Sequence, residues 1–184
     1  MSDRTSGATS PPIRVSDATI DDCEAVADIY AHYVQHTVAT FDYLVPSVSQ
    51  WHAKHAAITA AGRPFVVARA VDDGVEHVVG YAYLGTFRTM PAYDLSTEDS
   101  IYVRPGHGGR GIGTALMSAL LARADPDNVR QIVAVIAAIL TPLLPVTEHT
   151  ARIISALRWK LGHACQPTRP AEASAYQPRR MKGD

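Results

Sequence analysis

Two kinds of apolar spacing alternate along the chain and divide it into helices and strands. Four apolar residues recur at i, i+3, i+4 and i+7: Val26, Ile29, Tyr30 and Tyr33. This spacing predicts an amphipathic helix, and Thr19 with Asp22 gives the capping-box pattern that starts one. Ile13 to Ser16 predicts a short strand ahead of it. The Pro46-Ser47 pair starts a second helix, which ends at Gly62.

The middle of the chain predicts a sheet. Strands are expected over residues 64–70, 77–87, 96–103 and 130–137. The turn Asp72-Asp73-Gly74 joins the first two strands as a hairpin. A helix over residues 111–123 connects the last two, which should therefore lie parallel to each other.

The stretch from Ser96 to Arg123 organises the chain, because it runs from a strand through a glycine loop into a helix. Ile101, Tyr102 and Val103 are β-prone, and Pro105 ends the strand since it has no N–H for the ladder. Five glycines follow within eight residues: Gly106, Gly108, Gly109, Gly111 and Gly113. Glycines let the backbone approach a ligand and turn N–H groups toward it at the positive end of a helix dipole. The stretch predicts a phosphate-binding pocket.

Three other interpretations of this loop compete. A P-loop would need G-x-x-x-x-G-K-[ST], and the stretch contains no Lys. The residues from Gly106 to Gly111 formally match the dinucleotide pattern G-x-G-x-x-G, which would make the chain an oxidoreductase that binds NAD. However, the next strand ends without the acidic residue that should hold a ribose hydroxyl. The loop can also be glycine-rich without binding any ligand.

The run from Gly109 to Thr114 resembles the acetyl-CoA pyrophosphate loop of the GCN5-related N-acetyltransferase (GNAT) superfamily. The family pattern is [QR]-x-x-G-x-[GA], and this chain departs from it with Gly108 at the first position. The loop thus keeps its amides but lacks the side chain that usually helps to order it. The resemblance implies acetyl-CoA as co-substrate and no metal. The cofactor-binding residues that it implies are Ile101, Tyr102, Val103, Gly109, Arg110, Gly111, Ile112, Gly113 and Thr114.

Upstream, G-Y-A-Y-L-G-T-F-R-T-M-P-A-Y-D-L-S-T-E-D-S-I-Y-V resembles the block that marks the phosphinothricin and methionine sulfoximine acetyltransferase branch. The whole resemblance covers roughly residues 13 to 137. It implies an α/β (α+β) class, the GNAT fold, with a mixed, mostly antiparallel central sheet flanked by helices. In this fold the strands over 96–103 and 130–137 splay apart. The gap admits the pantetheine arm of the cofactor, which can pair with free backbone like a strand.

The chemistry that the resemblance implies is transfer of an acetyl group from acetyl-CoA to the amine of a small amino-acid-like substrate. Glu98 is the expected general base, because a carboxylate facing a cleft can take a proton directly or through water. Asp99 points to the opposite face and is expected to be solvated. The backbone N–H of Val103 is the expected donor to the thioester oxygen. The substrate-facing residues are expected to be Phe41, Arg88, Tyr93 and Glu98, each with an ordinary core, loop or surface role as the alternative.

Composition narrows the class of protein. The 184 residues fit one domain, and the net charge of −1 gives no argument for a nucleic-acid or anionic-membrane partner. Cys23 and Cys165 are too few for a disulfide framework or a zinc site, and Cys23 is expected to be buried. The apolar run 132–146 is shorter than the about 20 residues that a spanning helix needs. The N-terminus has no apolar leader, so a cytoplasmic location is expected.

Beyond Ala137 the family pattern is lost. Residues 1–12 are expected to be disordered, 13–163 to form the acetyltransferase domain with 138–163 atypical, and 164–184 to form a disordered tail. The helix reading L-H-x-x-x-G-[FY] is missing, and a shifted reading frame is one hypothesis for this. The alternative function is therefore a degenerate protein that binds CoA without turnover. Family members commonly form homodimers through their C-terminal strands, so a homodimer is one expected assembly, which this change leaves open.

Overall fold

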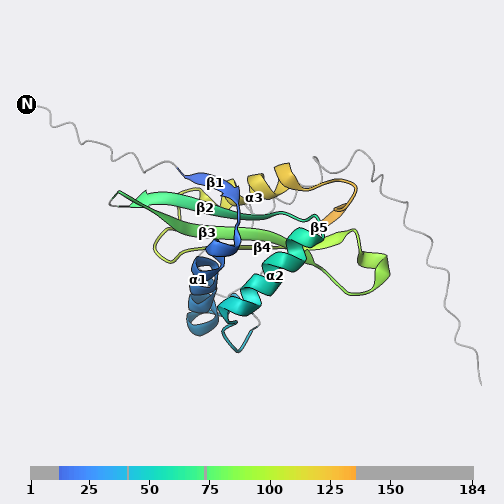
Figure 1. Cartoon of the computed structure of the whole chain (residues 1–184), viewed down its shortest axis with the longest axis horizontal. Helices are drawn as coiled ribbons and strands as arrows, with labels where there is room; N and C mark the ends of the chain where they lie inside the picture. The colour runs from blue at the N-terminus through green and yellow to red at the C-terminus, as the bar shows by residue number, and fades with distance from the viewer. Residues whose placement is uncertain (1–12, 41, 73, 136–184) are drawn as a thin grey trace, which may run out of the picture. The chain divides into compact units, whose positions relative to one another are not determined.

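The computed structural model describes residues 13–40, 42–72 and 74–135, which form one five-stranded sheet with helices on both faces (Figure 1). The strands are β1 Arg14–Asp17, β2 Phe65–Asp72, β3 Val75–Thr86, β4 Ser96–Val103 and β5 Gln131–Ala134, in that order across the sheet. Neighbours are antiparallel except β4 and β5, which are parallel. The mixed, mostly antiparallel sheet is confirmed. The predictions for residues 1–12, for Phe41 and for all residues after Val135 lie outside the described residues.

Three α-helices flank the sheet: α1 Cys23–His36, α2 Val48–Ala60 and α3 Ile112–Arg123. Figure 1 shows α1 and α2 on one face of the sheet and α3 on the other. The predicted capping box is present, with the Thr19 N–H donating to Asp22 Oδ2 at 2.8 Å. It opens a 3-10 turn, Ile20–Asp22, that leads into α1. A second 3-10 turn, Pro91–Tyr93, lies in the connection between β3 and β4.

Each face of the sheet has its own core, because side chains alternate along the strands. The core under α1 and α2 is aromatic and includes Tyr30, Trp51, Phe65, Tyr81 and Tyr83. The core under α3 is aliphatic and includes Val66, Val79, Leu84, Ile112, Leu116 and Leu120. Cys23 is only 1% exposed in the aromatic core, which confirms that it is a buried side chain.

The pairing between β4 and β5 covers only half of β4. It joins Ser96 to Gln131 and ends where Asp99 pairs with Ala134, whereas β3 pairs with β4 as far as Val103. Among the described residues, the edge of β4 from Ser100 to Val103 therefore has no strand beside it. This open edge connects the end of β5 to the glycine loop that follows β4.

Candidate functional site

The glycine loop after β4 has the backbone shape that its sequence predicts. Gly109 and Gly111 have positive φ angles of 74° and 76°, a region that other residues adopt at a cost. A Cβ added at either glycine would meet no atom within 4 Å. The space next to these two glycines is therefore open.

Helix α3 begins directly at this loop. Its first backbone hydrogen bond runs from the Ala115 N–H to the Gly111 carbonyl oxygen at 3.0 Å. The N–H groups of Ile112, Gly113 and Thr114 thus belong to the first turn, where an α-helix leaves its N–H groups without intrahelical acceptors. Together with the positive end of the helix dipole, they form a suitable site for phosphate oxygens. Arg110 lies half-buried in the same loop.

The open edge of β4 presents backbone groups of the residues predicted to bind the cofactor. The Arg104 N–H donates to the Val79 carbonyl oxygen of β3 at 2.8 Å. Because backbone groups of successive residues point to opposite edges, the N–H groups of Ile101 and Val103 point away from β3. The Tyr33 hydroxyl donates to the Val103 carbonyl oxygen at 2.6 Å and so fixes this end of the edge. An extended ligand can pair with the N–H groups that remain.

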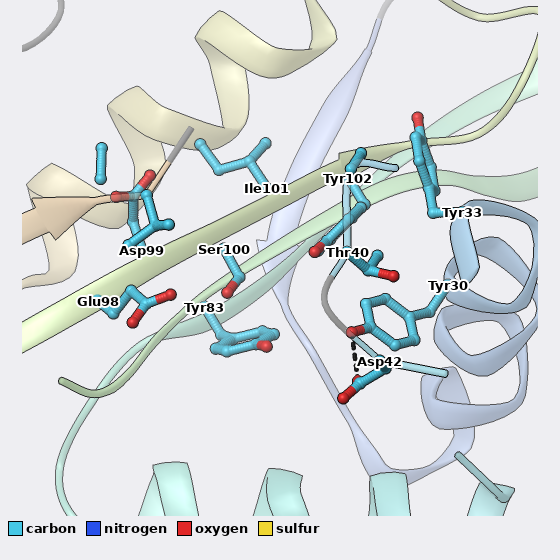
Figure 2. A pocket seen from close by; sticks show the side chains of 13 residues that line it. Tyr30, Tyr33, Thr40, Asp42, Tyr83, Glu98, Asp99, Ser100, Ile101 and Tyr102 are labelled. Carbon is cyan, nitrogen blue, oxygen red and sulfur yellow. Dashed lines mark hydrogen bonds between the residues drawn. The ribbon is translucent and has the colours of Figure 1, made fainter. Parts of the chain in front are cut away.

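A pocket of about 490 Å³ lies where β5 ends. Residues Glu98 to Tyr102 of β4 line it consecutively, together with Ala134 and Val135 at the end of β5. Tyr30 and Tyr33 of α1 form the opposite wall (Figure 2). Consecutive residues of one strand can line one pocket only if the pocket passes around the strand edge, and the end of β5 leaves room for this.

Glu98 and Asp99 lie on opposite sides of β4 in this pocket (Figure 2). Glu98 is half-buried, and its position on the pocket wall leaves it free to act as the predicted base. The expectation that Asp99 is solvated is wrong. Its Oδ1 is buried and has no hydrogen-bond partner among the described residues. Asp99 is also the last residue of β4 that pairs with β5, opposite Ala134. Burial raises the pKa of Asp99 to about 6, against the lowering effect of a hydrogen bond with its own backbone and with a smaller contribution from the nearby Glu98 charge.

Tyr30, Tyr33 and Tyr83 also line the pocket, and the sequence-based reasoning did not assign them to the site, whereas Tyr102 is one of the predicted cofactor-binding residues. The Tyr30 hydroxyl donates to Asp42 Oδ2 at 2.6 Å. Burial, with help from this hydrogen bond, raises the pKa of Tyr30, and burial raises the pKa of Tyr102 to about 12. Both hydroxyls therefore stay protonated at neutral pH. The available signal was the unusual presence of Tyr30 and Tyr33 on the apolar face of α1, where each brings a hydroxyl toward the sheet.

The other predicted substrate-facing residues lie elsewhere. Arg88 and Tyr93 are in the connection between β3 and β4, and neither lines the pocket. The Arg88 guanidinium lies 5.2 Å from the Phe87 ring centre and 5.7 Å from that of Tyr93. Phe41 lies outside the described residues. The structure thus brings Glu98, Ile101 and Tyr102 together, while the roles of Arg88 and Tyr93 stay predictions.

Within residues 13–40, 42–72 and 74–135, no group of three or more His, Cys, Asp or Glu side chains could hold a metal ion. Among the helices that the structure describes, none is long and apolar enough to cross a membrane.

Comparison with known proteins agrees with this geometry. Residues 25–142 match the Acetyltransferase (GNAT) family. The chain is 37% identical over 114 residues to phosphinothricin N-acetyltransferase of Alcaligenes faecalis, covering 62% of this chain and 56% of the relative. It is 35% identical over 103 residues to L-methionine sulfoximine/L-methionine sulfone acetyltransferase of Salmonella typhimurium, covering 56% and 58%. The chain thus spans less than two thirds of these two relatives.

A solved structure shows the same fold. The phosphinothricin acetyltransferase of Sinorhizobium meliloti, determined in complex with AcCoA, superposes with a TM-score of 0.64 at 36% identity. The match covers 79% of this chain and 73% of that one.

Proposed function

The chain belongs to the Acetyltransferase (GNAT) family, and on that premise we propose that it transfers an acetyl group from acetyl-CoA to the amine of a small amino-acid-like substrate. The relatives named above act, by their names, on phosphinothricin and on methionine sulfoximine. These two compounds or an analogue are the proposed acceptors. Because the chain spans less than two thirds of these relatives, its acetyltransferase activity is also proposed.

The open edge of β4 is the observation that carries the proposal. It begins at the pocket that contains Glu98 and ends at the glycine loop. The five residue steps from Glu98 to Val103 span about 16 Å at the usual strand rise. An extended pantetheine arm along this edge would place its diphosphate at the N-terminus of α3 and its thioester at the pocket.

Each chemical requirement of acetyl transfer then has a residue of this chain. Acetyl-CoA supplies the activated acetyl group. Glu98 takes the proton that the acceptor amine loses, directly or through a water molecule. An N–H group of the open edge polarises the thioester carbonyl. Ile101 lines the pocket, whereas Val103, the donor expected from the sequence, lies about 7 Å further toward the glycine loop. The N–H groups from Gly109 to Thr114 hold the diphosphate. The tyrosine hydroxyls of the pocket orient the acceptor.

Release of free thiol from acetyl-CoA, measured with phosphinothricin, methionine sulfoximine and a panel of other amines, tests the proposal. Glu98→Gln should lower kcat by about 100-fold or more, while calorimetric binding of acetyl-CoA is retained. Asp127→Asn, at an exposed position, is the matched control and should change neither value. Heat of CoA binding without thiol release for any amine would instead show a protein that binds CoA without turnover. Preference for NAD over CoA would indicate an oxidoreductase.

Assembly is a separate prediction. A homodimer, as is common in the family, would appear in light scattering as about twice the mass of the 184-residue chain. A monomer at the same protein concentration would contradict it.

A further inference from the structure

Asp99 lies at the point where β4 and β5 separate. It is the last residue of β4 that pairs with β5, opposite Ala134. Its Oδ1 is buried and has no hydrogen-bond partner within the described part of the chain. A charged oxygen in such a place is costly, whereas a protonated carboxyl is tolerated. The position therefore favours the protonated carboxyl more than an exposed position would.

Asp99 shares its pocket with Glu98, although the two side chains leave β4 in opposite directions (Figure 2). The pocket includes Tyr102, which packs with the aromatic core under α1, and Ile101, which packs with the aliphatic core under α3. The pocket thus continues around the free edge of β4. A carbonyl group seated where this free edge begins, next to the end of β5, would lie close to the carboxyl groups that project from the two faces of β4.

Acetyl transfer to an amine moves protons at two places. When the N–C bond forms, the nitrogen must lose a proton. When the C–S bond breaks, the sulfur leaves with the electron pair of that bond and must gain a proton. The nitrogen approaches one face of the planar carbonyl group, whereas the sulfur lies in its plane, so the base and the acid act at two different positions around the carbonyl carbon.

We infer that Asp99, in its protonated form, is the acid that delivers this proton to the sulfur of CoA. The inference rests on the proposed acetyl transfer and deepens it. Glu98 takes one proton from the nitrogen, and Asp99 gives one to the sulfur, so the products are the neutral amide and the free thiol. Glu98 is then protonated and Asp99 ionised. Passage of one proton between them through the pocket restores both groups.

The surroundings of Asp99 support this role. Burial raises its pKa to about 6, and a pantetheine arm beside it would displace water and raise the pKa further. A thiol has an ordinary pKa of about 8.5. Transfer of a proton from the carboxyl group to the thiolate is therefore downhill.

Two substitutions separate an acid from a structural residue. Asp99→Asn keeps the size and removes the proton, and should lower kcat roughly 100-fold with little change in the calorimetric Kd of acetyl-CoA. Asp99→Glu keeps the acid and should recover part of kcat. Infrared difference spectra of the acetyl-CoA complex should contain a protonated carboxyl band that is lost in Asp99→Asn. Circular dichroism checks the fold of each variant, and Asp127→Asn is again the exposed control.

The outcomes are distinguishable. Absence of thiol release by the unchanged protein overturns the proposed function and this inference together. Thiol release that Asp99→Asn leaves at the original kcat overturns this inference alone, as does a missing carboxyl band. If Asp99→Asn lost acetyl-CoA affinity and kcat to the same extent, Asp99 would have a structural role, and the inference would also be overturned. If Asp99→Asn does not fold, the kcat of Asp99→Glu and the protonated carboxyl band of the unchanged protein test the inference instead.

Discussion

Replacing Asp99 by Asn removes a carboxyl group whose pKa the fold raises, and the change should appear as a pH-dependent gain in stability. The ordinary pKa of this carboxyl is 3.8, and burial raises it to about 6 in the folded protein. Between these two values the unfolded chain has released the proton while the folded protein still holds it. The stability of the unchanged protein should therefore fall as the pH rises through this window.

The size of the effect follows from the two pKa values. One pKa unit corresponds to about 1.4 kcal/mol, so a shift from 3.8 to about 6 lowers the free energy of unfolding by about 3 kcal/mol. The loss is absent below about pH 4 and complete above about pH 6. Asn does not titrate, so its variant escapes the loss. The exchange of carboxyl for a buried amide adds an offset that does not depend on pH.

Urea denaturation at several values between about pH 4 and pH 8 measures this difference. The quantity to compare is the free energy of unfolding of Asp99→Asn minus that of the unchanged protein. Other acidic groups, such as Asp22 beside Arg69, then cancel. The difference should rise by about 3 kcal/mol with pH, and Asp127→Asn should show no such rise. A difference that is flat for Asp99→Asn, or that falls with pH, would refute the reasoning.

The remaining predictions concern the glycine loop and the edge of β4. Gly80→Ala should destabilise the protein by about 1–3 kcal/mol and weaken CoA binding in calorimetry, because its Cβ would come within 3.0 Å of a β4 carbonyl oxygen and 3.1 Å of an α3 side chain. Retained affinity for CoA would contradict this. Gly111→Ala should cost about 1 kcal/mol in urea denaturation, because its φ is 76°. Gly113→Ala, in open space within α3, should leave the free energy of unfolding unchanged or raise it. An equal fall in the free energy of unfolding of both variants would contradict the explanation from the positive φ of Gly111. Tyr33→Phe should cost about 1 kcal/mol, because it removes the hydroxyl that donates to the Val103 carbonyl oxygen; unchanged unfolding free energy would show that this contact is not stabilising.

Elements marked by local signals could be predicted from the sequence. The strand expected over residues 96–103 has these bounds in β4, and the helix expected over 111–123 starts one residue later, at Ile112. Pro105 and the glycines that follow it determine these ends through their own backbone restrictions, so no knowledge of distant residues is needed. The parallel pairing of β4 with β5 follows from the helix between them.

The pocket could be predicted only in part, because most of its walls depend on neighbours distant in the sequence. Glu98 could be placed from its motif, but the burial of Asp99 depends on β5 running beside it and stopping at Ala134. Strand alternation alone indicates the side to which Asp99 points and not what lies there. The Tyr30 hydroxyl reaches the pocket only because α1 packs across β4, a tertiary arrangement that an apolar stripe does not reveal.

The alternation along β4 also makes the site sensitive to changes in chain length. Loss or gain of one residue between Asp99 and Pro105 would leave both carboxyl groups in the chain. However, Glu98 and Asp99 would each then lie on the opposite face of β4 relative to the glycine loop. Two residues would restore the faces while moving the loop about 7 Å along the strand. This short segment can therefore accept altered side chains far more readily than an altered count of residues.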